Sequence, residues 1–170
     1  MPLTFQVHRE LTPDLRARLV DAITDVTNDG GAIGFVAPVD RDEVDATALR
    51  GPFDGALDLL LVGYEDGEAA AALFLLNRGF TLMDHVRLVK TVMVHPKHQG
   101  KGYGLALLRE AEAVARTLDG VELLHLTCRG GLGLERFYAK CGYTEVGRIP
   151  RMLRVAADDY RDEIHLALAL

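Results

Sequence analysis

Glycine occupies positions 100, 102 and 104 in HPKHQGKGYG (residues 95–104), between an apolar segment and a strongly helical one. Glycine is costly to order, so this run indicates a place where bare backbone is required. N–H groups at the start of a helix lack intrahelical partners and lie at the positive end of the helix dipole. The pattern therefore predicts a cradle for a phosphate group, to which Lys97 and Lys101 would add flexible positive charges.

Other phosphate-binding motifs fit this stretch poorly. A Walker loop requires GxxxxGK[ST] after a strand, and no such string occurs here. A Rossmann fingerprint places GxGxxG in the first strand–helix turn, whereas GKGYG lies in the middle of the chain. The structural alternative is a turn with incidental glycines, which the clean order of strand, glycine loop and helix disfavours.

The segments that must position this loop follow an α/β pattern. Alternating apolar residues predict strands, and a 3.6-residue period predicts helices. The expected order is β-α-α-β-β-β-α-β-α-β-β, which indicates one domain over residues 1–170 around a mixed sheet. Strands are expected at Leu3–Val7, Leu57–Tyr64, Glu68–Leu76, His85–His95, Val121–Cys128, Tyr143–Ile149 and Ile164–Leu170. Helices are expected from Thr12 to about Val26 and over Asp40–Leu49, Gly104–Leu118 and Leu134–Lys140.

Local signals support several of these boundaries. Thr12, followed by Pro13, predicts the start of the first helix, and Asp40 or Asp42 caps the second. The turn EDGE (residues 65–68) predicts a hairpin. The helix after the glycine loop has a predicted buried stripe of Leu105, Leu108, Ala111 and Ala115.

Composition excludes several classes of function. The net charge of −6 argues against a nucleic-acid partner. No apolar run is long enough for a membrane span and the N-terminus lacks a signal-peptide pattern, so a cytoplasmic protein is expected. Cys128 and Cys141 lack metal-ligand spacing, and His95 and His98 lack a nearby third ligand, so no metal is expected.

Charge is unevenly distributed along the chain. Residues 1–85 contain 15 acids and 6 bases, whereas residues 86–170 contain 10 acids and 13 bases. One interpretation is that these are ordinary solvent-exposed charges with no role in binding. The other is a site in which the second half binds an anion and the first half attracts a cation.

The segment Val94–Gly104, read as V-x-P-x-x-Q-G-x-G-x-G, resembles the acyl-CoA signature of the GNAT N-acetyltransferase superfamily. Gln99, Gly102 and Gly104 match its core, Q/R-x-x-G-x-G/A. The resemblance covers essentially the whole chain and implies a sheet whose two central parallel strands splay apart past the glycine loop. It also implies acetyl-CoA as co-substrate, with the Val94 N–H at the thioester carbonyl. The cofactor-binding residues would be Met93, Val94, Gln99, Gly100, Lys101, Gly102, Tyr103 and Gly104.

A second motif, FYAKCGY (residues 137–143), resembles the family's LYEKLGF. In that motif the tyrosine, here Tyr138, commonly protonates the departing thiolate. A tyrosine of pKa about 10 suits a thiol of pKa about 8.5. The alternative is a core tyrosine on a short helix.

The general base is left open by the resemblance. Many relatives carry a glutamate toward the start of the strand before the glycine loop, and alignment on Gln99 places Leu88 there. Candidate substitutes are Asp84, His85 and His125, or a chain of waters.

The acceptor side resembles a bacterial small-molecule subgroup that includes the tabtoxin-resistance acetyltransferase. Gly131 replaces the family's common asparagine, within TCRGGLGLERFYAKCGYTEVGRIP. The segment NDGGAIGF (residues 28–35) is similar to a loop that borders the acceptor pocket in that subgroup. It implies substrate contacts by Asn28, Asp29, Ile33 and Phe35. The other interpretation is a turn whose Phe35 fills the core.

Together these patterns predict an N-acetyltransferase that moves an acetyl group to the primary amine of a small molecule, such as a toxin or antibiotic, by direct attack in a ternary complex. The alternatives are a protein N-terminal or lysine acetyltransferase and a non-catalytic acyl-CoA sensor. A homodimer formed by exchange of C-terminal strands is also reasonable.

Overall fold

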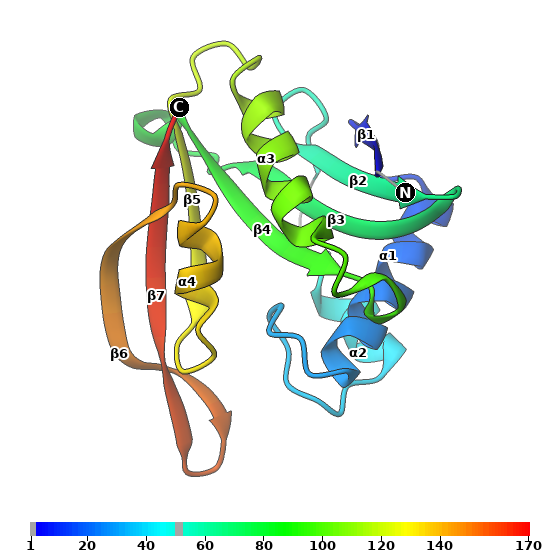
Figure 1. Cartoon of the computed structure of the whole chain (residues 1–170), viewed down its shortest axis with the longest axis vertical. Helices are drawn as coiled ribbons and strands as arrows, with labels where there is room; N and C mark the ends of the chain where they lie inside the picture. Colours follow the sequence, from blue (N-terminus) through cyan, green and yellow to red (C-terminus); the bar gives the residue numbers. More distant parts are fainter. Residues whose placement is uncertain (1–2, 50–52) are drawn as a thin grey trace.

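Seven strands form one mixed sheet in the computed structural model, which describes residues 3–49 and 53–170 (Figure 1). Their order across the sheet is β1-β2-β3-β4-β5-β7-β6, and β4 runs parallel to β5. The strands are β1 (Thr4–His8), β2 (Leu59–Glu65), β3 (Glu68–Asn77), β4 (Val86–Val94), β5 (Leu123–Arg129), β6 (Thr144–Ala156) and β7 (Asp159–Ala169). The helices are α1 (Pro13–Asn28), α2 (Arg41–Thr47), α3 (Tyr103–Ala115) and α4 (Leu134–Ala139), with short 3-10 turns η1 (Thr81–Met83) and η2 (Pro96–His98). The predicted α/β class and element order are confirmed.

Side-chain caps fix the starts of the first two helices. The Thr12 hydroxyl accepts a hydrogen bond from the Leu15 N–H, and the Asp40 carboxylate accepts one from the Glu43 N–H. Each bond satisfies one of the N–H groups that a helix start leaves unpaired. Thr12 was predicted as the first cap, and Asp40 rather than Asp42 proves to be the second.

The last two strands are longer than predicted. Instead of Tyr143–Ile149 and Ile164–Leu170, β6 and β7 form a hairpin of 13 and 11 residues. Most of β6 is exposed on both faces. Because neither face of β6 is buried, its sequence does not alternate between apolar and polar residues. Alternation identifies half-buried strands, so it did not predict the full length of β6.

The helices divide the core into two clusters on opposite faces of the sheet (Figure 1). Alternation along β2 sends Leu60 and Val62 to the α1 side and Leu59 and Leu61 to the α3 side. The buried stripe of α3 differs slightly from the prediction. Leu105 is only partly buried, and the buried positions are Tyr103, Leu107, Leu108, Ala111 and Ala115.

The two central parallel strands separate as they approach their carboxyl ends (Figure 1). They pair from Val86–Leu123 to Leu88–His125 and then diverge. Beyond this point β4 contains a bulge, because Ala72 of β3 pairs with Met93 whereas Phe74 pairs with Lys90. A bulge bends its strand and re-aims its side chains. The result is a wedge-shaped gap between β4 and β5.

Candidate active site

The glycine loop, residues 99–104, connects η2 to α3 beside the carboxyl end of β4. Gly100 and Gly102 have φ angles of +77° and +80°, which favour glycine. Within the described part of the chain, a Cβ at either residue would meet open space. Gly102 is the N-cap of α3, so the unpaired N–H groups of the first turn lie at this loop with the helix dipole behind them. This exposed backbone fits a phosphate group.

Gly104 is required for a different reason. Its φ is not in the left-handed region, but a Cβ there would lie 2.9 Å from Phe137 Cζ. Glycine at this position lets α3 approach α4 closely. The third glycine of the motif therefore serves helix packing.

The register of β4 directs the Val94 amide away from β3. The His95 N–H donates to the Ala70 carbonyl at 2.8 Å, which makes 70–95 a hydrogen-bonded pair. Pairs alternate along an antiparallel ladder, so the next pair, Ala71–Val94, is a non-hydrogen-bonded one. Its Val94 N–H and C=O therefore point toward the side that β5 has left. The Gln99 side chain donates to the Val94 carbonyl at 3.2 Å, and the side chain of Met93 is buried in the α1-side core.

A cleft of about 240 Å³ occupies the gap between β4 and β5. Its lining comes from both faces of the sheet, so the cleft passes between the strands. The lining residues are Ala32, Ile33, Gly34, Leu88, Val89, Lys90, Thr91, Val92, Leu126, Thr127 and Tyr138. Splaying of the strands thus creates a channel that a long, narrow ligand could enter.

Tyr138 lines this cleft from α4 and is only 8% exposed. Its ring packs edge-on against Phe137 and Tyr143, with centroids 5.1 and 6.0 Å away. Burial, with a smaller contribution from Cys128, raises the pKa of Tyr138 above its ordinary value of 10. The phenol is therefore protonated at neutral pH and is a weaker acid than a free tyrosine.

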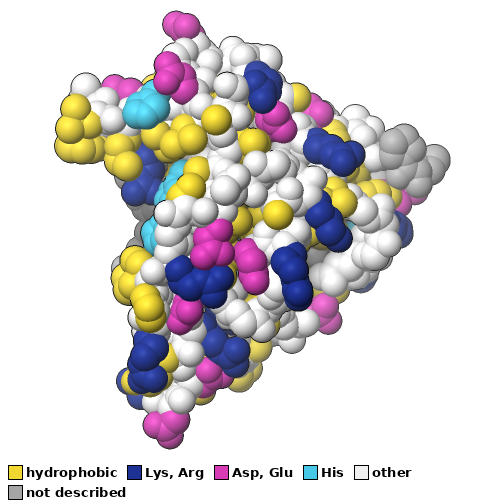
Figure 2. Space-filling view, turned by 60° about the vertical axis from the view of Figure 1, so that its left-hand side comes forward, with side chains coloured by type: hydrophobic (Ala, Val, Ile, Leu, Met, Phe, Trp, Pro, Cys, Tyr) yellow, Lys and Arg dark blue, Asp and Glu magenta, His cyan; other side chains and the backbone are white. Residues whose placement is uncertain are grey.

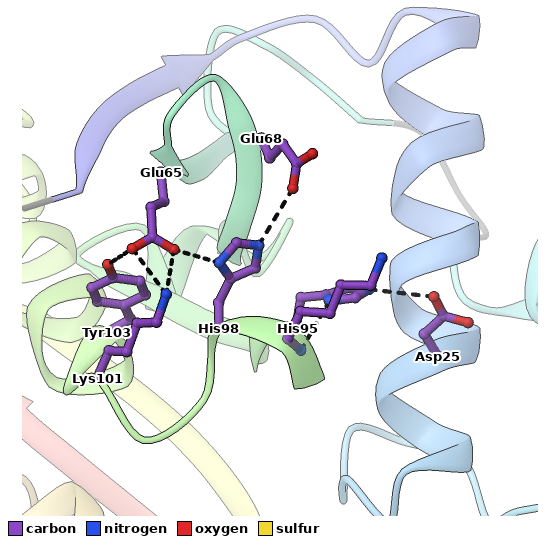
Figure 3. A network of polar contacts seen from close by, with 8 residues as sticks. Asp25, Glu65, Glu68, His95, His98, Lys101 and Tyr103 are labelled. Atoms are coloured by element: carbon purple, nitrogen blue, oxygen red, sulfur yellow. Dashed lines mark hydrogen bonds and ion pairs between the residues drawn. The ribbon is translucent and has the colours of Figure 1, made fainter. Parts of the chain in front are cut away.

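Lys101 and Tyr103 contact a carboxylate that the sequence analysis did not single out. Glu65, the last residue of β2, accepts hydrogen bonds from Lys101, Tyr103 and His98 (Figure 3). Lys101 was expected to supply charge for a phosphate, and its ammonium instead lies 2.8 Å from Glu65 Oε2. Glu65 is one of three acidic residues in the turn EDGE (residues 65–68), and nothing in that pattern indicates such a role.

Residues 35–143 match the family model described as acetyltransferase (GNAT) family. The chain belongs to this family. The matched region contains β4, the glycine loop and Tyr138. The model covers the family as a whole, so the narrower resemblance to the tabtoxin-resistance subgroup stays a prediction.

Solved structures share the fold of this acetyltransferase. The putative acetyltransferase YncA of Salmonella typhimurium, solved with its cofactor acetyl-CoA, is 22% identical with a TM-score of 0.74, and the match covers 99% of this chain and 94% of that one. A ribosomal-protein-alanine N-acetyltransferase of Brucella melitensis is 18% identical (TM-score 0.75; 97% and 99% covered). The spermidine N-acetyltransferase of Vibrio cholerae, in complex with CoA and spermine, is 14% identical (TM-score 0.74; 99% and 95% covered).

The four residues expected to contact the acceptor, at the end of α1 and in the loop after it, have different surroundings in the acetyltransferase. Ile33 lines the cleft. The Asn28 amide instead bridges both backbone groups of Val39 at 2.9 Å, and Asp29 is the exposed C-cap of α1. Phe35 packs against the α1-side core, and its carbonyl accepts a hydrogen bond from Arg129. Ile33 is thus the residue of the four whose side chain faces the gap between β4 and β5.

A second recess of about 320 Å³ adjoins the cleft, sharing Ala32, Gly34 and Thr127 with it. Its charged lining consists of Arg129, Arg154 and Glu163. Lys and Arg side chains are interspersed with Asp and Glu across the face in Figure 2. Both signs of charge therefore line the recess, and both also occur on the face drawn in Figure 2.

Two histidines stack at the narrow end of the gap. The His125 ring on β5 lies 5.4 Å from that of His165 on β7, with 3.3 Å between His125 Nε2 and His165 Nδ1. Glu163 Oε2 lies 3.5 Å from His165 Nε2. Burial, reinforced by His165, lowers the pKa of His125 below its ordinary 6.5. His125 is therefore mainly a neutral imidazole at pH 7.

Other chemistry is limited in the described part of the chain. It holds no group of three or more His, Cys, Asp or Glu side chains arranged for a metal ion. Cys128 and Cys141 are buried free thiols, and burial raises the pKa of Cys128 to about 11. No described helix is both long and apolar enough to cross a bilayer.

Proposed function

We propose that this acetyltransferase transfers an acetyl group from acetyl-CoA to the primary amine of a small molecule, by direct attack in a ternary complex. The observation that carries the proposal is the cleft between β4 and β5, which has Tyr138 in its wall. The glycine loop follows β4 in the chain, after the short turn η2. Such a cleft can hold the thioester and the amine together, and positioning alone lowers the barrier substantially.

The glycine loop would hold the pyrophosphate of acetyl-CoA. The backbone at Gly100 and Gly102 is open, and the first-turn N–H groups of α3 provide donors. Lys97, which is exposed, would add a positive charge. The acyl arm would then run along the free edge of β4 beyond Leu88.

Val94 and Tyr138 would act on the reacting bonds. The Val94 N–H points toward the gap and would donate to the carbonyl oxygen as negative charge develops there. As the C–S bond breaks, Tyr138 would protonate the sulfur. An ammonium substrate loses two protons in the overall reaction. The thiol retains one, and the other reaches solvent.

His125 would accept the proton that frees the amine for attack. It faces the same side of the sheet as its register partner Leu88, which lines the cleft. It is uncharged at neutral pH, as a base must be. His125 thus occupies the space beside the position where many relatives carry a glutamate.

The acceptor is tested with a panel of polyamines, amino acids, aminoglycosides, and lysine and alanyl peptides, using release of CoA thiol as the readout. We expect a small amine to give the highest kcat/KM. A peptide as the best acceptor would establish the protein-acetylating alternative. Tight acetyl-CoA binding without turnover on any amine would establish the sensor alternative, which the cleft-lining Tyr138 argues against. A homodimer stays a prediction.

A further inference from the structure

A buried carboxylate connects the β2–β3 hairpin to the glycine loop. Glu65 Oε2 lies 2.6 Å from His98 Nδ1, and the Lys101 ammonium lies 3.0 and 2.8 Å from the two carboxylate oxygens. The Tyr103 hydroxyl also donates to Glu65 (Figure 3). We call Glu65, His98, Lys101 and Tyr103 the Glu65 cluster. Its three donors alternate with Gly100 and Gly102 along the loop.

The burial and hydrogen bonds of the Glu65 cluster indicate that it restrains the loop and is not simply a solvent-exposed ion pair. The side chain of Glu65 is 9% exposed, whereas that of Lys101 is 46% exposed. Hydrogen bonds to an ionised, buried carboxylate are stronger than neutral ones. Gly100 and Gly102 have the greatest backbone freedom to lose, so their loop needs external contacts to keep one geometry.

We propose that Glu65 is a positioning residue for acetyl-CoA: it holds the glycine loop in its phosphate-binding geometry before the ligand arrives. The inference rests on the proposed function, in which this loop binds the pyrophosphate. Glu65 does not touch the ligand itself. It acts through the side chains of His98, Lys101 and Tyr103, and so fixes the backbone between them.

A carboxylate beside an anion site needs an explanation, because its charge repels phosphate. In this cluster the charge is offset by Lys101, which contacts both oxygens of Glu65. The side-chain donors turn inward to Glu65, while the open backbone at Gly100 and Gly102 stays exposed. The repulsion is thus reduced and the loop gains an anchor.

The opposite hypothesis is that Glu65 restrains Lys101 from binding phosphate. The two hypotheses predict opposite signs for Glu65→Gln. If Glu65 positions the loop, the variant binds CoA more weakly. If Glu65 restrains Lys101, the freed ammonium makes the variant bind CoA more tightly.

The experiment is calorimetry with CoA on the full chain, comparing Glu65→Gln with the matched control Glu68→Gln. Glu68 lies on the same hairpin with a side chain 78% exposed, 3.8 Å from His98 Nε2, so both variants remove one negative charge from the same region. We expect Glu65→Gln to weaken CoA binding about tenfold or more. A tenfold loss is what results when the loop adopts its binding-competent geometry about one-tenth of the time. Glu68→Gln should stay within about twofold of wild type.

Two further readouts separate positioning from general destabilisation. Amide exchange at residues 99–104 should be faster in ligand-free Glu65→Gln, with exchange in the β2–β3 core unchanged. KM for acetyl-CoA should rise while kcat at saturation stays within a few-fold. If Glu65→Gln does not fold, Tyr103→Phe removes one contact and should weaken CoA binding with the same exchange signature.

The inference would be overturned if Glu65→Gln bound CoA more tightly than the control or within twofold of it. The same criterion applies to Tyr103→Phe if that variant is the one measured. Gly102→Asp distinguishes this outcome from failure of the proposed function. If Gly102→Asp abolishes CoA binding while Glu65→Gln has no effect, the loop binds the ligand and Glu65 does not position it. If neither substitution affects binding, the assignment of the loop itself is wrong.

Discussion

Leu88 of β4 and His125 of β5 form the last registered pair between the two central parallel strands. Beyond them the strands diverge, and the cleft lined by Tyr138 opens in the gap. The pair therefore marks the apex of the wedge, with an apolar side chain on one strand and an ionisable one on the other. The proposed proton acceptor, proton donor and ligand channel are all arranged around this point.

Tyr138→Phe removes one hydroxyl and keeps the ring contacts with Phe137 and Tyr143. If the hydroxyl protonates the leaving thiolate, the single-turnover rate should fall about 10²–10⁴-fold. KM for acetyl-CoA should stay within a few-fold, because the lost interaction exists only in the transition state. A wild-type single-turnover rate would show that another group or solvent delivers the proton.

Gly102 can be tested with a matched pair of variants. Asp and Asn have nearly the same shape, and both tolerate the positive φ of this residue better than most side chains do. Gly102→Asp adds a negative charge at the proposed pyrophosphate site, so CoA affinity measured by calorimetry should collapse. Gly102→Asn should retain more affinity. Equal losses would mean that shape, rather than charge, governs the site.

The pH dependence of activity tests the proposal that His125 is the base. The charged groups that shift its pKa are His165 and Glu163 on β7 and Arg78 after β3. Its pKa is lowered, so activity should be lost as pH falls through a value below 6.5, where the base becomes protonated.

Variants of the two β7 neighbours should move this acid limb in opposite directions. His165→Asn removes a contribution that lowers the His125 pKa, so the limb should shift to higher pH. Glu163→Gln removes a contribution that raises it, so the limb should shift to lower pH. The measurement is the single-turnover rate with the best acceptor of the panel. An acid limb unchanged in both variants and in His125→Asn would exclude His125 as the base.

Glu65 should contribute to acid stability. Hydrogen bonds from Lys101, then Tyr103 and His98, lower the pKa of Glu65 from 4.5 to about 2. A lowered carboxyl pKa stabilises the fold above the unfolded value, and this stabilisation is lost as pH falls from about 4.5 to about 2. The difference in urea midpoint between wild type and Glu65→Gln should therefore shrink over that window. A constant difference would contradict the assignment.

Gly104→Ala tests the packing of α3 against α4. The new Cβ would lie 2.9 Å from Phe137 Cζ, so overpacking should reduce the free energy of unfolding by about 1–3 kcal/mol. Phe137→Leu should partly relieve the clash in the double variant. Gly147→Ala, in open space on β6, is the control and should change urea unfolding little. Equal effects of the two alanines would remove the packing explanation.

The sequence by itself determined the order of the elements and the place of the glycine loop. Both depend on short-range physics: the caps at Thr12 and Asp40, the period of α3 and the backbone freedom of Gly100 and Gly102. The tertiary structure decided what joins these parts. Residues 38 positions apart, Glu65 and Tyr103, meet because β2 ends beside the loop. His125 and His165 stack because β7 pairs with β5, and β6 is held by its hairpin partner rather than by burial. Such long-range contacts follow from sheet order and register, which no local pattern of residues encodes.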